Sequence, residues 1–451
     1  MSGQDERKPI GVGLIGFGTI GTGVVKVLRD NADVIEQRLG SPLRLVRIAD
    51  LDLDTDRGVD LSGIVFDADA SALIADPDVQ IVIELIGGYD VPRKFILEAF
   101  AAGKHVVTAN KALLALHGRE IFGAAASAKV EVAFEAAVGG GIPVLRSLRE
   151  GLAANQIETV LGILNGTTNY VLTEMESTGE DFDVVLKRAQ ELGYAEADPT
   201  FDVEGIDAAH KLALMTTMAF GAEITFKDIP TTGIRGLLPI DFELAAQFGY
   251  RIKLLGIAKC HRSEDGQDRE ERIETRVQPT MVRDSSLLAK VDGAMNAVLV
   301  IGNAVGPTLY YGAGAGEMPT ASAVVGDLME IAREIRRGGS GPVPPLSYFP
   351  EHISPKPFVP DAELKGRHYL RISLRISVKD QPGLLGKVTS LLGDEAICVE
   401  TAMVRSAEGT DSIILLTGTA AEDGLQRAIA RIAELDSVSD RPRVIRIEEE
   451  A

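Results

Sequence analysis

Asp207 and Lys211, near the middle of the chain, have the side-chain types and the spacing of a proton-transfer pair. A helix is expected from about Gly205, and residues four apart on a helix share one face. The helix continues with the apolar residues 212–215, and a lysine beside apolar surface with carboxylates in reach can donate a proton near neutral pH. An ordinary surface ion pair, worth under about 1 kcal/mol, fits the same spacing.

A second candidate site lies near the start of the chain, where six residues match the pattern G-x-G-x-x-G. The first glycine permits a tight turn, the second lets the backbone approach a pyrophosphate, and the third lets a helix pack closely on a strand. N–H groups at the start of that helix can hold the phosphates. The pattern predicts a dinucleotide site, with a ligand-free turn as the alternative, formed by Gly16, Phe17, Gly18, Thr19, Ile20 and Gly21.

Asp50 and Arg57 bear on the identity of the dinucleotide. Asp50 follows the second expected strand, where a carboxylate can accept hydrogen bonds from a ribose 2′-hydroxyl and so favours NAD. Arg57 lies a few residues later and could bind a 2′-phosphate, and Asp50 could equally be a turn residue. We therefore expect NAD, or the use of both NAD and NADP.

Three further segments could contact a ligand. Lys111 follows the fourth expected strand, at the sheet edge where α/β proteins bind ligands, although a surface helix could begin in the same way. The three glycines within 134–143 indicate a closely approached backbone, where turning carbonyls and Glu135 could hold a hard cation, or an interdomain hinge. The polar turn 165–169 suits a polar ligand or helix capping.

The elements that must position the first of these residues alternate between strand and helix. Strands are expected at residues 10–16, 43–49, 79–85 and 104–108, with helices between them, for example at 91–102. This alternation predicts a parallel sheet with helices on both faces, which is an α/β Rossmann nucleotide-binding domain.

The pattern changes after about residue 139. Helical segments at 182–192 and 205–221 mix with strand-like runs at 159–164, 251–258 and 273–279. The mixture predicts an α+β domain for substrate binding and dimerisation. The highly polar stretch 262–271 is expected to be a loop within it.

A linker rich in glycine and proline follows, because residues 338–345 and the prolines at 350, 355, 357 and 360 exclude helix and central strand. Beyond it the expected elements have the ferredoxin-like order βαββαβ. They lie at residues 369–378, 384–392, 398–405, 412–419, 422–435 and 443–448.

These patterns together predict four parts of the chain. The nucleotide-binding domain is expected at 1–140 and is completed by about 312–336, and the substrate-binding catalytic domain at 141–311. The linker is expected at 337–367 and the ferredoxin-like domain at 368–451.

The composition limits the class of protein. The chain has 451 residues, too many for one ordinary core, and 46 basic against 66 acidic side chains give a formal charge of −20. Nucleic acid and anionic membranes need basic patches, so both are disfavoured as partners. Two distant cysteines form no disulfide framework or metal motif and fit a reducing cytoplasm, and no apolar run reaches the roughly 18 residues of a membrane span.

The motifs resemble those of the homoserine dehydrogenase family over nearly the whole chain. The matching segments, several in one order, are 16–21, 108–114, 135–143, 193–199, 207–211, 249–256 and 312–325. The resemblance implies reversible NAD(P)H-dependent reduction of L-aspartate 4-semialdehyde to L-homoserine in threonine, methionine and isoleucine biosynthesis. Such a substrate needs carboxylates for its ammonium group and a cationic donor for the developing alkoxide.

The resemblance also implies roles for single residues. Lys211 would be the general acid, oriented by Asp207, and Lys111 would contact the nicotinamide and share the proton transfer. Family members that use NADP tend to carry a basic residue after the second strand, so Asp50 argues against a strict NADP preference. Further contacts are implied for Glu196, Asp202 and Thr167 with the substrate, for Gly193, Gly314 and Gly316 with the cofactor, and for Glu135, Val138, Gly140 and Ile142 with a structural sodium ion.

Residues 378–385 resemble the strand-to-helix turn of an ACT domain, with Asp380 and Gly383 as candidate regulatory residues. The resemblance implies feedback regulation by threonine, and a dimerisation module without a ligand is the alternative. ACT domains generally pair side by side, so both alternatives predict a homodimer or homotetramer. Residues 412–417 form a plausible strand for that pairing.

Overall fold

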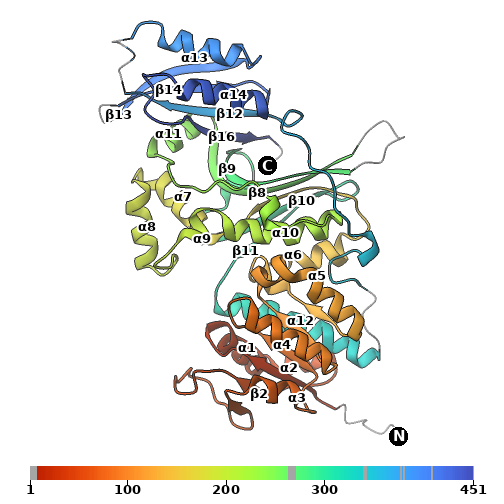
Figure 1. Cartoon of the computed structure of the whole chain (residues 1–451). Helices are drawn as coiled ribbons and strands as arrows, with labels where there is room; N and C mark the ends of the chain where they lie inside the picture. Colours follow the sequence, from red (N-terminus) through yellow and green to blue (C-terminus); the bar gives the residue numbers. More distant parts are fainter. Residues whose placement is uncertain are drawn as a thin grey trace. The chain divides into compact units, whose positions relative to one another are not determined.

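The computed structural model describes residues 8–262, 271–338, 343–375, 378, 381–407 and 410–449 (Figure 1). The chain divides into two compact units, each built from separate stretches. The first holds residues up to 166, 207–229 and 295–355, and the second holds 167–206, 230–294 and 356–451. Asp380, and all but the end residues of the predicted loop 262–271, lie outside the described residues.

Within its described part, the first unit contains a six-stranded parallel sheet in the order β3-β2-β1-β4-β5-β6. The order runs outward in both directions from β1 and β4, and ligands of such sheets bind at the carboxyl ends of the strands. This confirms the predicted Rossmann fold. The strands are β1 (Ile10–Ile15), β2 (Leu43–Ala49), β3 (Val65–Asp67), β4 (Ile81–Glu84), β5 (His105–Thr108) and β6 (Val132–Ala133).

The central strands of this sheet are buried on both sides because apolar helix faces cover them. The helix that begins after the second glycine segment, drawn in cyan, packs against α1 (Figure 1), and Lys26 on α1 pairs with Glu317 at 2.6 Å. The helices are α1 (Thr19–Asp30), α2 (Ala32–Leu39), α3 (Ala70–Ala75), α4 (Asp90–Ala101), α5 (Lys111–Ala128) and α12 (Glu317–Arg337).

The first unit also contains three antiparallel strands, in which β10 lies between β7 and β11. The patterns above predict β7 but neither β10 nor β11. For β11, the glycines at 312–316 suggest a ligand loop and not the end of a strand. The remaining elements here are η1 (Glu135–Ala137), α6 (Val144–Arg146), η2 (Ser147–Gly151), β7 (Ile157–Ile163), α10 (Ile206–Phe220), η3 (Phe226–Asp228), β10 (Met295–Gly302), β11 (Gly306–Ala313) and η5 (Pro350–His352).

In the second unit the strand order is β8-β9-β16-β12-β14-β13. Strands β16, β12, β14 and β13, with α13 and α14 packed on one face (Figure 1), form the predicted ferredoxin-like fold. The elements are α7 (Gly166–Thr178), α8 (Phe182–Glu191), α9 (Thr200–Val203), α11 (Pro239–Gln247), β8 (Tyr250–Arg262), β9 (Glu271–Arg283), η4 (Leu288–Lys290), β12 (Lys365–Ser373), α13 (Leu384–Gly393), β13 (Val399–Ala407), β14 (Thr410–Thr417), β15 (Ala420–Ala421), α14 (Glu422–Ala433) and β16 (Arg443–Glu448).

One expectation about this sheet is wrong. Residues 412–417 belong to β14, which pairs with β12 on one side and β13 on the other, so its edges are already used. The edge strand is β13. In the part of the chain that the structure describes, no helix is both long and apolar enough to cross a membrane.

Candidate active site

Lys211 lies on α10 with its ammonium group largely buried in the first unit. Its Nζ donates hydrogen bonds to the Leu164 carbonyl oxygen and to Asp207 Oδ2, both at 2.7 Å. An ammonium group carries three donors. One N–H of Lys211 therefore has no acceptor among the described residues, and it can serve an oxygen of a substrate.

Asp207 links two lysines across α10 and α5. Its Oδ1 lies 3.2 Å from Lys111 Nζ, and its Oδ2 accepts from Asn165 Nδ2 at 2.9 Å in addition to Lys211. Burial acts to raise the pKa of Asp207, but the charges of Lys211 and Lys111 outweigh it and hold that pKa well below its usual range. The cluster of one carboxylate and two ammonium groups thus has a positive charge, which complements an oxyanion.

The start of α5 sets the position of Lys111. Asn110 caps this helix, because its Oδ1 accepts from the Leu113 N–H at 3.0 Å. The amide of the same side chain donates to the Gly88 carbonyl oxygen at 2.9 Å, on the segment that follows β4. The predicted helix start therefore exists, and it fixes Lys111 at the carboxyl ends of β4 and β5.

Glu84, the last residue of β4, is buried at this edge of the sheet and was not among the predicted site residues. Its two carboxylate oxygens accept from Thr108 Oγ1 at 2.6 Å and from the Ile86 N–H at 2.8 Å. Burial raises the pKa of Glu84 to about 7 despite these bonds. Glu84 thus connects the ends of β4 and β5, and its only sequence signal is a carboxylate that ends an apolar strand.

The glycine-rich loop has the form that a pyrophosphate requires. Gly16 has φ +97°, and a Cβ on Gly21 would lie 2.3 Å from the Gly16 carbonyl oxygen, so larger residues are excluded. A Cβ on Gly18 would meet no atom within 4 Å, which leaves the side of the loop where a ligand would approach open. No side chain caps the start of α1 in the described structure, so its N–H groups can bind phosphate.

Asp50 and Arg57 both contact this loop. Asp50 accepts from the Phe17 and Asp52 N–H groups at 2.5 and 2.8 Å, so it does form a turn. Arg57 lies with its guanidinium 4.8 Å from the centre of the Phe17 ring and donates to three backbone carbonyls, including that of Phe17 at 2.5 Å. Most donors of Arg57 are therefore used within the protein.

The carboxylate of Glu135 binds N–H groups at the start of α6. Leu145 and Arg146 donate to it at 2.9 and 2.7 Å, and burial raises its pKa to about 7. Asp327 on α12, which was not predicted, accepts from the Glu135 N–H at 2.8 Å and pairs with Arg146 at 3.1 Å.

The backbone that follows Glu135 presents carbonyl groups. Gly140 has φ +55°, and a Cβ there would lie 2.5 Å from the Gly314 carbonyl carbon. Among the described residues, the carbonyl oxygens of Val138 and Gly140 accept no hydrogen bond, whereas that of Ile142 accepts from Val144 at 2.8 Å. Two free carbonyls on a tight turn suit a hard cation.

The other predicted site residues fall into two groups. Gly314 and Gly316 lie in the first unit, where Gly316 precedes α12 with φ +120°. Gly193, Glu196, Asp202 and Thr167 belong to the second unit; Glu196 is exposed, and Thr167 donates to the Tyr194 carbonyl oxygen at 2.6 Å. The structure thus brings together Lys211, Asp207 and Lys111, and it joins to them Asn165, the first residue of the predicted polar turn 165–169.

Comparisons with known proteins cover the chain almost from end to end. Family models match residues 16–135 (Homoserine dehydrogenase, NAD binding domain), 143–329 (Homoserine dehydrogenase) and 372–437 (ACT domain). Homoserine dehydrogenases of Neisseria gonorrhoeae and Pseudomonas aeruginosa are each 45% identical, over 98% of this chain and 99% of theirs. The crystal structure of a homoserine dehydrogenase from Thiobacillus denitrificans is 47% identical, with a TM-score of 0.90 over 98% of this chain and 99% of that one.

Proposed function

The chain belongs to the homoserine dehydrogenase family of oxidoreductases, and we propose that it interconverts L-aspartate 4-semialdehyde and L-homoserine with a nicotinamide cofactor. The observation that carries the proposal is the buried Lys211 ammonium, which Asp207 and the Leu164 carbonyl orient and which retains one free donor. Homoserine formed in this way would serve threonine, methionine and isoleucine biosynthesis.

Lys211, Asp207 and Lys111 have different roles in the proposed proton transfer. A bound nicotinamide supplies or accepts the hydride at the carbon that is reduced or oxidised. Lys211 donates its free proton to the aldehyde oxygen in the reduction and accepts the hydroxyl proton in the oxidation. Asp207 keeps Nζ in place, and the Lys111 charge, 3.2 Å from Asp207, stabilises negative charge on the substrate oxygen.

We propose that Glu196 binds the substrate ammonium group, with Asp202 and Thr167 as further contacts. Glu196 is exposed, and its carboxylate makes no hydrogen bond or ion pair with another described residue, so it can accept hydrogen bonds from a substrate. We expect Glu196→Gln to raise KM for homoserine about 10–100-fold with a smaller change in kcat, since a lost ammonium contact weakens binding of substrate and transition state alike. Steady-state kinetics would check this, with Glu191→Gln as an exposed control; an unchanged KM would refute the role.

The cofactor is proposed to be NAD or both NAD and NADP. Asp50 places a carboxylate beside the loop, where it would accept from a ribose 2′-hydroxyl and repel a 2′-phosphate. Replacing Asp50 by Asn should therefore lower the ratio of kcat/KM for NAD to that for NADP about tenfold. Asp52→Asn, which alters a neighbouring exposed carboxylate, serves as the control; equal ratios in all three proteins would remove Asp50 from cofactor selection.

The turn with the free Val138 and Gly140 carbonyls is proposed to bind a sodium ion. Glu135 would support this site through the start of α6, where its two carboxylate oxygens accept N–H groups. The ion would hold the turn against the segment that contains Gly314 and would take no part in the redox step.

Threonine is proposed as an effector of the C-terminal domain, in a homodimer or homotetramer. Gly383 precedes α13 with φ +90° at an exposed position, and a side chain there would be strained. We expect threonine to inhibit the wild type and Gly383→Ala to weaken that inhibition by at least about tenfold. Gly393→Ala, at the other end of α13, is the control, and absence of inhibition in the wild type would leave the domain as a dimerisation module.

The activity itself is tested by homoserine-dependent reduction of NAD and NADP in parallel. A related reductase for another aldehyde is the alternative, and it would show activity with other amino alcohols and none with homoserine. Failure with both cofactors in a folded protein would contradict the proposed function.

A further inference from the structure

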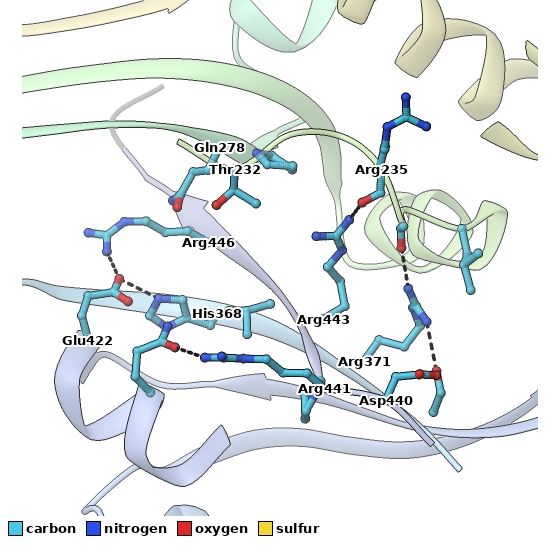
Figure 2. Close-up of a pocket in the computed structure, with 17 residues that line it drawn as sticks. Thr232, Arg235, Gln278, His368, Arg371, Glu422, Asp440, Arg441, Arg443 and Arg446 are labelled. Atoms are coloured by element: carbon cyan, nitrogen blue, oxygen red, sulfur yellow. Dashed lines mark hydrogen bonds and ion pairs between the residues drawn. The ribbon is translucent and has the colours of Figure 1, made fainter. Parts of the chain in front are cut away.

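A cavity of about 700 Å³ lies in the second unit, next to the first residues of β16 (Figure 2). Loop residues 232–238, the end of β12, the start of α14 and the turn 440–442 enclose it. All of its lining residues belong to this one unit. The cofactor loop and Lys211 lie in the other unit, so neither forms part of the cavity.

The cavity exists because β9 and β16 diverge. The two strands pair in parallel only over Arg446–Glu448, opposite Thr280, Met281 and Val282. Earlier along β9, the loop that begins at Thr232 lies beside this strand, and the Thr232 N–H donates to the Val277 carbonyl oxygen at 2.7 Å. The first half of β16 is therefore left without β9 beside it, and the space between them remains open.

Guanidinium groups dominate the lining. Two carboxylates, Glu422 and Asp440, line the cavity with them, and Asp241 and Glu204, outside the lining, pair with two of the arginines. The surplus of positive charge is therefore about +1 before any contribution from His368, in a chain whose formal charge is −20. The arginines are Arg235, Arg371, Arg441, Arg443 and Arg446.

Three of these arginines have carboxylate partners. Arg371 donates to Asp241 at 2.8 Å, Arg235 to Glu204 at 2.7 Å, and Arg446 pairs with Glu422, which also contacts His368 at 2.9 Å. Figure 2 shows the Arg446 side chain turned toward Glu422 and the Arg443 side chain turned toward the Arg235 backbone.

Arg441 and Arg443 have no carboxylate partner among the described residues. Arg441 is exposed and donates to the Gln426 side chain at 2.9 Å, whereas Arg443 donates, within the described part of the chain, only to the Arg235 carbonyl oxygen. Burial lowers the pKa of Arg443, because no neighbouring carboxylate fully compensates its charge. A partly buried cation without an anionic partner is costly unless an anion binds there.

We propose that this cavity binds a small organic anion with two or more negative charges, held by Arg441 and Arg443 and bordered by Arg446. Guanidinium groups bind carboxylate and phosphate oxygens in the same bidentate way, so the shared chemistry is an oxyanion. The volume accommodates a phosphate ester or a tricarboxylate. An anion here would link β16 of the ACT domain to the loop 232–238, and so the site is suited to regulation by a metabolite other than an amino acid.

Isothermal titration calorimetry of the full-length protein tests the proposal with two probes, inorganic pyrophosphate and citrate. Saturating NAD, which carries no phosphate monoester, is present throughout, so that the glycine-rich loop cannot bind the probe. We expect at least one probe to bind with Kd below about 1 mM, and the Kd to rise at least about tenfold in the double variant Arg441→Gln/Arg443→Gln. Binding of pyrophosphate alone would assign the phosphate class, and binding of citrate alone the carboxylate class.

Arg427→Gln is the matched control, because Arg427 is an exposed arginine on α14 that pairs with Asp423 and Glu395 and does not line the cavity. It should bind the probes as the wild type does. If the double variant does not fold, Arg441→Gln alone replaces it, since this exposed side chain makes one hydrogen bond. Binding of neither probe to the wild type, or the same Kd in the cavity variants, would overturn the proposal.

Discussion

Replacement of Lys211 by methionine is expected to lower kcat about 10²–10⁴-fold in both directions, the usual range for loss of a general acid–base group. Methionine keeps much of the volume of lysine but donates no hydrogen bond. The Leu164 carbonyl and Asp207 would lose their shared partner, while the glycine-rich loop, on other elements, would keep its form. Kinetics in both directions, together with the Kd of the cofactor, separates a chemical defect from a binding defect.

Lys104→Met is the matched control for this variant. Lys104 also donates to two backbone carbonyls, those of Asp76 and Val79, but at the opposite end of β5 from Lys111. It should keep kcat near the wild-type value. Lys111→Met should lose less than Lys211→Met, because the Lys111 side chain is 31% exposed against 11% for Lys211 and makes a single contact to Asp207. A Lys211→Met enzyme with wild-type kcat would exclude Lys211 as the proton donor.

Asp207→Asn is expected to lower kcat/KM about 10²-fold and the free energy of unfolding by about 3 kcal/mol. The substitution keeps the shape of the side chain but leaves two ammonium groups, Lys111 and Lys211, without the carboxylate between them. Lys211 is nearly buried, so its uncompensated charge is costly. Denaturant unfolding and steady-state kinetics measure the two effects.

The stability effect should depend on pH in a defined direction. The pKa of Asp207 is lowered on folding. Its contribution to the free energy of unfolding is therefore complete above the pKa of the unfolded chain, about 4, and is lost as the pH falls through the pKa of the folded protein. The difference between wild type and variant should thus be largest at neutral pH and shrink below about pH 4. Asp67→Asn, which breaks a more exposed pair with Arg47, should cost under about 1 kcal/mol; an equal cost in both variants would argue against a special role of Asp207.

Local patterns predicted the elements whose sequences alternate or repeat clearly. Strand β2 has the predicted bounds, and the last four strands have the ferredoxin-like order, because short apolar runs separated by turn residues leave few alternatives. The i, i+4 spacing placed Asp207 and Lys211 on one face of α10, and the structure joins them at 2.7 Å.

Other features depend on contacts between segments distant in sequence. Asn165 reaches Asp207 over 42 residues, and Asp327 reaches the Glu135 N–H over 192, so no local pattern contains either contact. The arginine cavity has the same origin, because β9 and β16 diverge only in the folded chain. The ferredoxin-like order itself places the third strand, β14, between two neighbours, so the expected pairing through residues 412–417 is at odds with the predicted fold.

The most direct measurement follows the hydride itself. Reduction of L-aspartate 4-semialdehyde with a reduced nicotinamide cofactor that carries deuterium at both C4 positions should give L-homoserine with one deuterium at its C4, detected by nuclear magnetic resonance, and Lys211→Met should form this product far more slowly. Homoserine without deuterium, or no homoserine from a folded protein, would contradict direct hydride transfer to the aldehyde at the Lys211 site.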